Sequence, residues 1–203
     1  MTTTPLGLYN LTAPVVMAHP NLFEARAFGP KGKESGTPKF SATLVIPGDH
    51  PDAGPIKNLA IKLAKEQWPG RDLKELQMPF SSGTKAADKR AAERKAAGKE
   101  PDGEYQRGCM ILPARSKYEP KLSALMNGGI VDFHDESARK ANKDKFFFGA
   151  EVLAQINLAP YKGVGKNPDG VCAYLNMVLA TGKGKKLSGG GGQSAAEAFK
   201  GYV

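Results

Sequence analysis

The sequence predicts a mainly β protein, a small barrel with one amphipathic helix and long basic insertions. Three observations favour this fold class. Several segments alternate apolar and polar side chains with the period of two that is typical of half-buried strands. Loops rich in glycine and proline separate these segments. One stretch has clear helical spacing, so the combination indicates a barrel decorated by insertions.

The first two strands are predicted to form a hairpin. Residues 15–28 are extended, with an interruption at residues 19–21 (His-Pro-Asn). Residues 31–36 (KGKESG) follow as a basic, flexible turn. The second strand covers residues 39–46 and places Phe40, Ala42, Leu44 and Ile46 on one face.

An amphipathic helix is predicted over residues 53–68, and Pro69 and Gly70 end it. We expect this helix to lie against the barrel. Trp68 completes its apolar stripe, so we interpret Trp68 as a core residue rather than as a surface for base stacking. The stripe consists of Ile56, Leu59, Ala60, Leu63, Ala64 and Trp68.

Residues 83–103 form a charged insertion of Ala, Lys, Arg and Glu without large apolar side chains. Such a segment can be helical, but it has no apolar face to bury. We interpret it as a solvated surface helix or a mobile loop in preference to a dedicated DNA clamp.

The remaining strands are predicted in the second half of the chain. Residues 105–118 (YQRGCMILPARSKY) form the third long strand. A glycine turn at 128–129 precedes a short apolar run. Residues 146–158 alternate with the even positions on one face, and residues 171–180 form the last strand after a loop at 160–170.

We expect one domain over residues 1–187, followed at 188–203 by a glycine-rich linker and a flexible C-terminal tail. Cys109 and Cys172 lie far apart and are interpreted as free thiols of a reducing compartment rather than as a disulfide. No apolar run approaches the roughly 18 residues of a spanning helix. The start, MTTTPLGLYN, lacks the basic and hydrophobic regions of a signal peptide. We therefore expect a cytoplasmic protein without a membrane partner.

The charge balance points to a polyanionic partner. Lys and Arg number 29 against 20 Asp and Glu, which gives a formal net charge of +9 and a pI near 9.5. Such an excess favours nucleic acid or an anionic membrane surface.

No catalytic or metal-binding motif stands out. Gly165 and Lys166 are followed by Asn167, where a phosphate-binding P-loop needs Ser or Thr. The histidines are isolated from one another, and no CxxC pair occurs. We therefore expect no enzyme activity, no cofactor and no metal. A metal-dependent nuclease is the least favoured hypothesis, because no spaced acidic motif supports it.

Basic and aromatic residues are interleaved on the predicted strands and their loops. Single-strand binders need this mixture, since cations follow the phosphates while aromatic faces accept any base. Phe40, Phe146 and Phe148 share faces with aliphatic residues and are assigned to the core. Tyr105 and Tyr118 are equally compatible with core packing and with base stacking. The candidate nucleic-acid-binding residues are Lys31, Lys33, Lys39, Phe80, Tyr105, Arg107, Arg115, Lys117, Tyr118, Tyr161 and Lys162.

Several soft motifs occur in a characteristic order over most of residues 14–190. In this order and spacing the chain resembles the OB-fold single-stranded DNA-binding proteins of tailed bacteriophages. None of the motifs is a catalytic signature. The matching stretches are NLFEARAF (21–28), PKFSATLVIP (38–47), MPFSSG (78–83), YQRGCMILPARSKYEP (105–120), FFFGAEVLAQINLAPY (146–161) and GVCAYLNMVLATGKGKKLSGG (170–190).

The resemblance implies a five-stranded OB barrel that coats single-stranded DNA during phage replication and recombination, in the cytoplasm of the host. It also implies replication or recombination proteins as partners, and homodimers or cooperative arrays. Phage binders of this broad type often end in an acidic tail that closes with an aromatic residue. Here Phe199 and Tyr202 lie near the end, but Glu197 is the only acid and Lys200 offsets it. This departure leaves the role of the tail open.

The sequence thus predicts a protein that binds single-stranded DNA without sequence preference. The alternative is a basic virion or genome-packaging protein that neutralises nucleic acid without preferring single strands.

Overall fold

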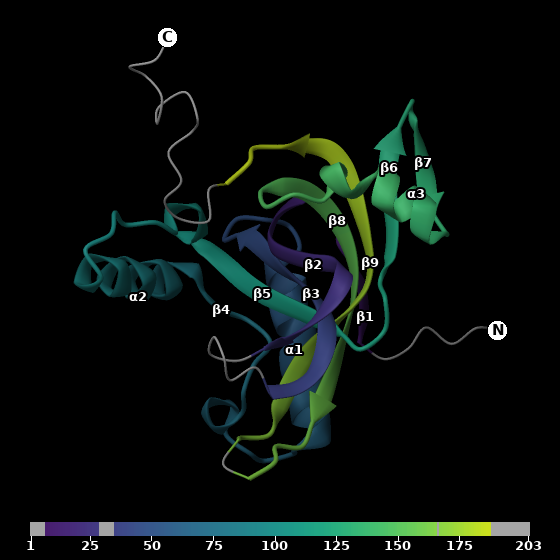
Figure 1. Ribbon diagram of the computed structural model, residues 1–203. Coiled ribbons are helices and arrows are strands. Elements are labelled where there is room, and N and C mark those ends of the chain that lie inside the picture. The colour runs from purple at the N-terminus through teal and green to yellow at the C-terminus, as the bar shows by residue number, and fades with distance from the viewer. Residues whose placement is uncertain (1–6, 29–34, 166, 188–203) are drawn as a thin grey trace, which may run out of the picture.

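The computed structural model describes residues 7–28, 35–165 and 167–187 (Figure 1). The helices are α1 (Ala53–Gln67), α2 (Gly83–Ala96) and α3 (Glu136–Ala141), with short 3-10 turns η1 (Leu73–Glu75), η2 (Glu104–Gln106) and η3 (Lys143–Lys145). The strands are β1 (Leu8–Asn10), β2 (Val15–Phe28), β3 (Ser35–Pro47), β4 (Ser81–Ser82), β5 (Cys109–Ser116), β6 (Lys121–Met126), β7 (Gly129–Phe133), β8 (Ala150–Tyr161) and β9 (Gly170–Gly184).

Five strands close into a barrel in the order β2, β3, β5, β9, β8, and β8 pairs again with β2. Only the contact between β5 and β9 is parallel within this ring. The short strands β1 and β4 extend the barrel at β8 and β5, and the β6–β7 hairpin continues from β9. This architecture confirms the predicted fold class, a mainly β protein with a five-stranded OB-type barrel.

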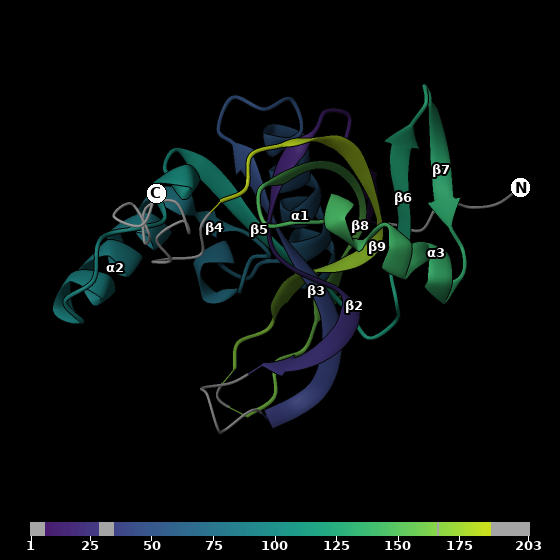
Figure 2. The same cartoon turned by 45° about the horizontal axis from the view of Figure 1, so that its top comes forward.

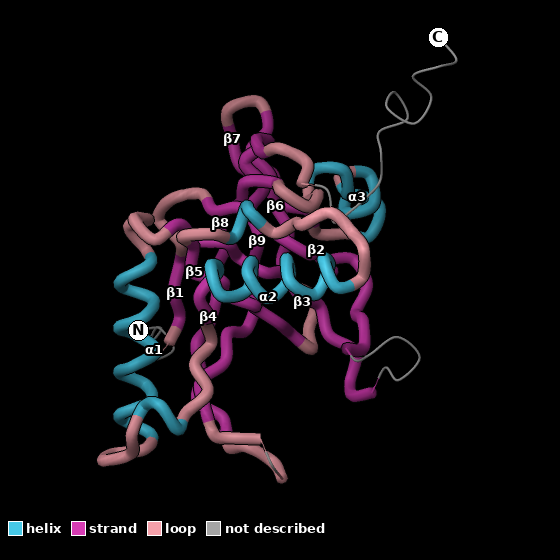
Figure 3. Tube along the Cα trace, turned by 90° about the vertical axis from the view of Figure 1, so that its left-hand side faces the viewer, coloured by secondary structure: helices cyan, strands magenta, loops and turns pink. Residues whose placement is uncertain are grey.

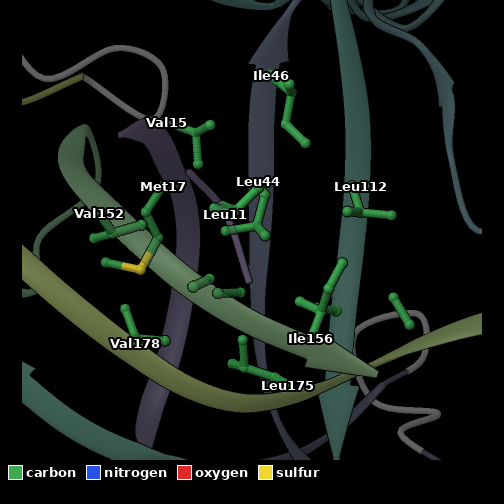
Figure 4. Close-up of a cluster of buried hydrophobic side chains, with 14 of the residues drawn as sticks. Leu11, Val15, Met17, Leu44, Ile46, Leu112, Val152, Ile156, Leu175 and Val178 are labelled. Atoms are coloured by element: carbon green, nitrogen blue, oxygen red, sulfur yellow. The ribbon is translucent and has the colours of Figure 1, made fainter. Parts of the chain in front are cut away.

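The period of two in the sequence places the apolar residues inside the barrel. In β8, alternate residues from Ala150 to Leu158 are buried, and the residues between them are half-buried. Leu44 and Ile46 of β3 and Leu112 of β5 are completely buried. Figure 4 shows these side chains pointing from different strands into one core.

Helix α1 is the amphipathic helix that the sequence predicts, and it packs against β8 and β9 along one side of the barrel (Figure 3). Its predicted stripe is buried or half-buried against the core, Trp68 included. Asp52, just before the helix, accepts hydrogen bonds from the Tyr9 hydroxyl (2.7 Å) and the Thr12 amide (2.8 Å). Burial alone would raise the pKa of Asp52, but these hydrogen bonds lower it.

Two insertions lie on opposite sides of the barrel. The charged insertion forms α2, which projects to the left in Figures 1 and 2, whereas β6, β7 and α3 lie to the right. The β6–β7 turn is Asn127-Gly128, with φ of 50° and 81° at the two residues, as a tight hairpin requires. Arg139 of α3 is buried and donates hydrogen bonds to the carbonyl oxygens of Pro120 and Leu22, both at 3.1 Å.

Some predicted boundaries are wrong. The strand expected over 105–118 is shorter in the structure and begins only at Cys109, as β5. Before it, residues 104–106 form η2, and Gly108 has a left-handed conformation (φ 75°) that interrupts the extended backbone. The strand expected from Phe146 begins at Ala150 instead, after η3 and a turn. Helices α2 and α3 add to the single helix that the sequence clearly predicts. In the part of the chain that the structure describes, no helix is both long enough and apolar enough to cross a membrane.

Candidate nucleic-acid interface

A groove of about 530 Å³ lies on the outer face of the barrel over β3, β5 and the start of β9. We call it the β5 groove. Its residues are far apart in the sequence and come from β3, β5, β8 and β9 and from the segment 77–81. Five predicted binding residues line it, namely Lys39, Phe80, Arg115, Lys117 and Tyr161.

Strand parity explains why the basic residues reach the groove. Ala114 and Ser116 of β5 are buried, so the intervening Arg115 and the following Lys117 point outward and are exposed. Lys39 immediately precedes Phe40, which pairs with Ser116 in the neighbouring strand. Lys39 and Lys117 therefore flank the same cross-strand pair on the outer face of the sheet.

Lys39 and Lys117 are available to bind an anion. Among the described residues, neither forms a salt bridge or a hydrogen bond with a carboxylate. By contrast, Arg71 at the edge of the loop after β8 is held by Asp169 at 2.5 Å. This ion pair and the Gly163 amide lower the pKa of Asp169, with the Gly163 hydrogen bond as the larger cause. Asp169 is thus already paired with a cation.

Two tyrosines contribute rings to the groove. Tyr161 ends β8, and its hydroxyl donates a hydrogen bond to Gln77 Oε1 at 2.9 Å. Tyr174 of β9 is 42% exposed, so part of its ring is open to a ligand. Burial raises the pKa of Tyr161, and a hydrogen bond with Cys172 raises that of Tyr174. Both rings are therefore uncharged near neutral pH and do not repel phosphates.

Sequence reasoning missed Tyr174. A signal was present, because Val171, Ala173 and Leu175 alternate as buried residues of β9 and leave position 174 outside. An aromatic residue at an outward position of a strand is a candidate for binding rather than for core packing.

One wall of the groove is the segment from Gln77 to Ser81, which crosses the barrel face. The Gln77 amide donates to the Asp169 carbonyl, and the Val171 amide donates to the Gln77 carbonyl, both at 2.9 Å. A Cβ on Gly170 would lie 2.2 Å from the Gln77 carbonyl oxygen, so only glycine permits this approach. Phe80 in the same segment packs partly on the core. The wall is therefore held rigidly by the barrel.

Two predicted binding residues lie elsewhere, at the end of β5 next to α2. The Arg107 guanidinium donates to Glu104 (3.0 Å) and to Asp88 (2.8 Å). Tyr105 is half-buried, and its ring packs edge-on against Phe148 with centroids 5.5 Å apart. The structure therefore does not bring Tyr105 and Arg107 together with the β5 groove, because the strand that was predicted to include them begins only at Cys109.

The other candidates have different outcomes. Tyr118 is 83% exposed beside Lys117, so its ring is not a core residue. Lys162 is exposed next to Tyr161. Lys31 and Lys33 lie outside the described residues. Of the rings assigned to the core, Phe146 is buried, Phe148 packs on a smaller cluster outside the barrel, and Phe40 is only half-buried.

Metal-binding residues do not gather within the described ranges. Across residues 7–28, 35–165 and 167–187, no three His, Cys, Asp or Glu side chains lie together so that they could hold a metal ion. Cys109 and Cys172 are free thiols and half-buried.

Comparisons with known proteins give a match to one family model and to several solved structures. A family model described as "Enterobacter phage Enc34, ssDNA-binding protein" matches residues 10–202. No curated protein sequence matches the chain.

Solved structures share the fold at low sequence identity. A C-terminal truncation of the single-stranded DNA-binding protein from bacteriophage Enc34 has a TM-score of 0.64 and 18% identity, over 89% of this chain and 88% of that one. The same phage protein in complex with ssDNA has a TM-score of 0.59 and 18% identity, over 92% and 90%. The single-stranded DNA-binding protein gp2.5 of bacteriophage T7 has a TM-score of 0.52 and 11% identity, over 92% and 98%.

Proposed function

This chain belongs to the family of the ssDNA-binding protein of Enterobacter phage Enc34, and we propose that it binds single-stranded DNA in the β5 groove without sequence preference. We place this activity in the replication or recombination of phage DNA, in the cytoplasm of the host. The protein itself catalyses no reaction in this proposal. The proposal depends on one observation. Two lysines without a carboxylate partner among the described residues, Lys39 and Lys117, line the same groove as two partly exposed tyrosines, Tyr161 and Tyr174.

The chemistry of the groove suits a single strand. Lys39, Arg115 and Lys117 supply charge for successive phosphates, and each phosphate that is neutralised releases counterions. Tyr161 and Tyr174 supply rings on which bases stack, and every base has such a face, so no sequence is preferred. In a duplex the bases are paired and stacked on one another, and their faces are not available to the tyrosines. Stacking therefore adds a preference for single strands to the general attraction of a basic surface.

The decisive experiment is a titration of labelled oligo-dT and of a duplex of the same length over a series of salt concentrations. We expect far tighter binding of oligo-dT, with log affinity falling linearly against log salt by about 0.7 per phosphate contacted. Oligo-dC and a mixed sequence should bind with similar affinity. Equal affinity for the duplex would favour genome packaging instead. Magnesium-dependent cleavage that EDTA abolishes would favour a nuclease.

We extend the proposal to self-association as dimers or cooperative arrays along the strand, and to replication or recombination proteins as partners. Cooperative arrays would give a sigmoidal titration on a long oligo-dT and a hyperbolic one on an oligonucleotide that holds a single protein.

A further inference from the structure

A local irregularity in β2 presents His19 to solvent. The pairing of β2 with β3 shifts register between Ala18, which faces Thr43, and Asn21, which faces Ser41. Within this bulge His19 has a φ of 47°, a left-handed conformation that residues with a side chain rarely adopt. Bulges redirect side chains and are over-represented next to functional sites. The backbone here places an imidazole outside the sheet, where regular pairing would not.

The His19 ring lies on an aromatic base. It stacks on Phe148 with centroids 4.9 Å apart and an interplanar angle of 23°. Phe148 in turn meets Tyr105 edge-on, at 5.5 Å and 81°. Both rings pack on a small apolar cluster of Ala18, Val45 and Ile111 on the outer face of the sheet. His19 itself remains exposed. Its flat ring therefore lies at the surface and rests on Phe148.

The same face of the sheet carries the β5 groove. Ser41, the partner of Asn21, pairs on its other side with Arg115, and Thr43 pairs with Pro113; Arg115 and Pro113 both line the groove. Asn21 Nδ2 also donates a hydrogen bond to Ser41 Oγ at 3.2 Å. A line from β9 through β5 and β3 to β2 crosses three strand spacings, roughly 14 Å in all. A few nucleotides can follow it.

His19 offers a ring rather than a charge. One face of the ring is covered by Phe148 while the side chain as a whole stays exposed. This partial burial lowers the pKa of His19, the positive charge of Arg90 lowers it further, and Asp102 opposes these effects more weakly. The imidazole of the free protein is therefore mainly uncharged at neutral pH, and stacking is the contribution that we assign to it.

We propose that His19, supported by Phe148, is a second base-stacking platform, and that a bound single strand crosses the sheet from Tyr174 and Arg115 to His19. This inference rests on the proposed function of the β5 groove. It assigns a binding role to a residue in the sequence interruption at 19–21 and explains why β2 keeps an unfavourable backbone conformation there.

The test is His19→Gly, because glycine adopts a positive φ readily and removes only the ring. Affinity is measured at pH 7.5 for a thymidine dinucleotide, which is too short to reach from the groove to His19, and for oligo-dT of about 16 nucleotides, the upper limit of the site size of an OB fold. We expect the longer oligonucleotide to bind about 5- to 150-fold more weakly, the range for one lost base stack. The shorter one, held in the groove, should bind as before, and the salt slope should not change. His19→Trp should retain the affinity for the longer strand.

His134→Ala is the matched control, since its imidazole is 86% exposed on the other side of the barrel, beyond β7. Unchanged thermal unfolding of His19→Gly would show that the fold is intact. The proposal is overturned if His19→Gly binds the longer strand normally, or if both lengths lose affinity equally. If the protein binds no single-stranded DNA, or if Lys39→Ala/Lys117→Ala has no effect, the groove assignment itself fails.

Discussion

Basic residues lie near both ends of β5, but their partners differ. At the α2 end, Arg90 and Arg94 are held by Asp102, and Arg107 is held by Asp88 and Glu104. At the groove end, Lys39 and Lys117 have no carboxylate partner within the described ranges. A cation that is paired with a carboxylate must give up that ion pair to bind a phosphate, whereas an unpaired cation gives up only its contacts with water. Net charge therefore says less about DNA binding than the pairing of each charge does.

The largest effect is expected from the unpaired lysines of the β5 groove. Lys39→Ala/Lys117→Ala should lower affinity for oligo-dT by at least about tenfold, because charge-assisted hydrogen bonds contribute about 1.5–3 kcal/mol each. The slope of log affinity against log salt should fall by about 0.7 for each phosphate contact that is lost. Lys62→Ala/Lys65→Ala removes the same two charges from exposed positions of α1 and should leave both quantities nearly unchanged. Equal losses in the two double variants would mean that only net charge matters.

The rings of the groove should act independently of salt. Tyr174→Ala should weaken binding by about 1–3 kcal/mol, the usual contribution of a stacked base, without changing the salt slope. Tyr174→Phe keeps the ring and should bind like the unaltered protein. Fluorescence anisotropy at several salt concentrations measures both. A changed slope in Tyr174→Ala would assign this tyrosine to the phosphate path instead.

At the α2 end, the charges should matter for stability. Asp102→Ala leaves Arg90 and Arg94 without their shared carboxylate, and we expect a loss of about 1–3 kcal/mol in the free energy of unfolding. Urea denaturation measures it. Affinity for oligo-dT should stay within about twofold when the folded variant is titrated. A large gain in affinity would instead reveal that Asp102 masks a second cationic binding surface.

The smallest effect is expected at Arg107. The sequence predicts that Arg107 contacts a phosphate. In the structure, however, its guanidinium donates hydrogen bonds to Glu104 and Asp88 at the surface. Arg107→Ala should leave the free energy of unfolding nearly unchanged, because ion pairs exposed to solvent contribute little to stability. It should leave the salt slope of oligo-dT binding unaltered. A slope reduced by about 0.7 would place Arg107 on the path of the DNA after all.

Much of the fold follows from local patterns in the chain. The alternation in β3 and β8 identifies which residues enter the core, and the spacing from Ile56 to Trp68 identifies α1. The same parity predicts that Arg115 faces outward from β5. These features depend on near neighbours only, since a strand or a helix presents its faces with a fixed period.

The composition of the site depended on long-range contacts. Closure of the barrel through β8 and β9 brings Tyr161 and Tyr174 beside Lys39, although more than 100 residues separate them in the chain. A left-handed glycine at 108 separates Arg107 from β5, the strand that leads to Lys117. The sequence alone determined a basic, mainly β chain with alternating faces, and its resemblance to a known family implied five strands in the barrel. Only the tertiary structure decided which basic side chains form ion pairs with carboxylates and which lie beside tyrosine rings. The reason is that these partners come from distant segments, which closure of the barrel brings together.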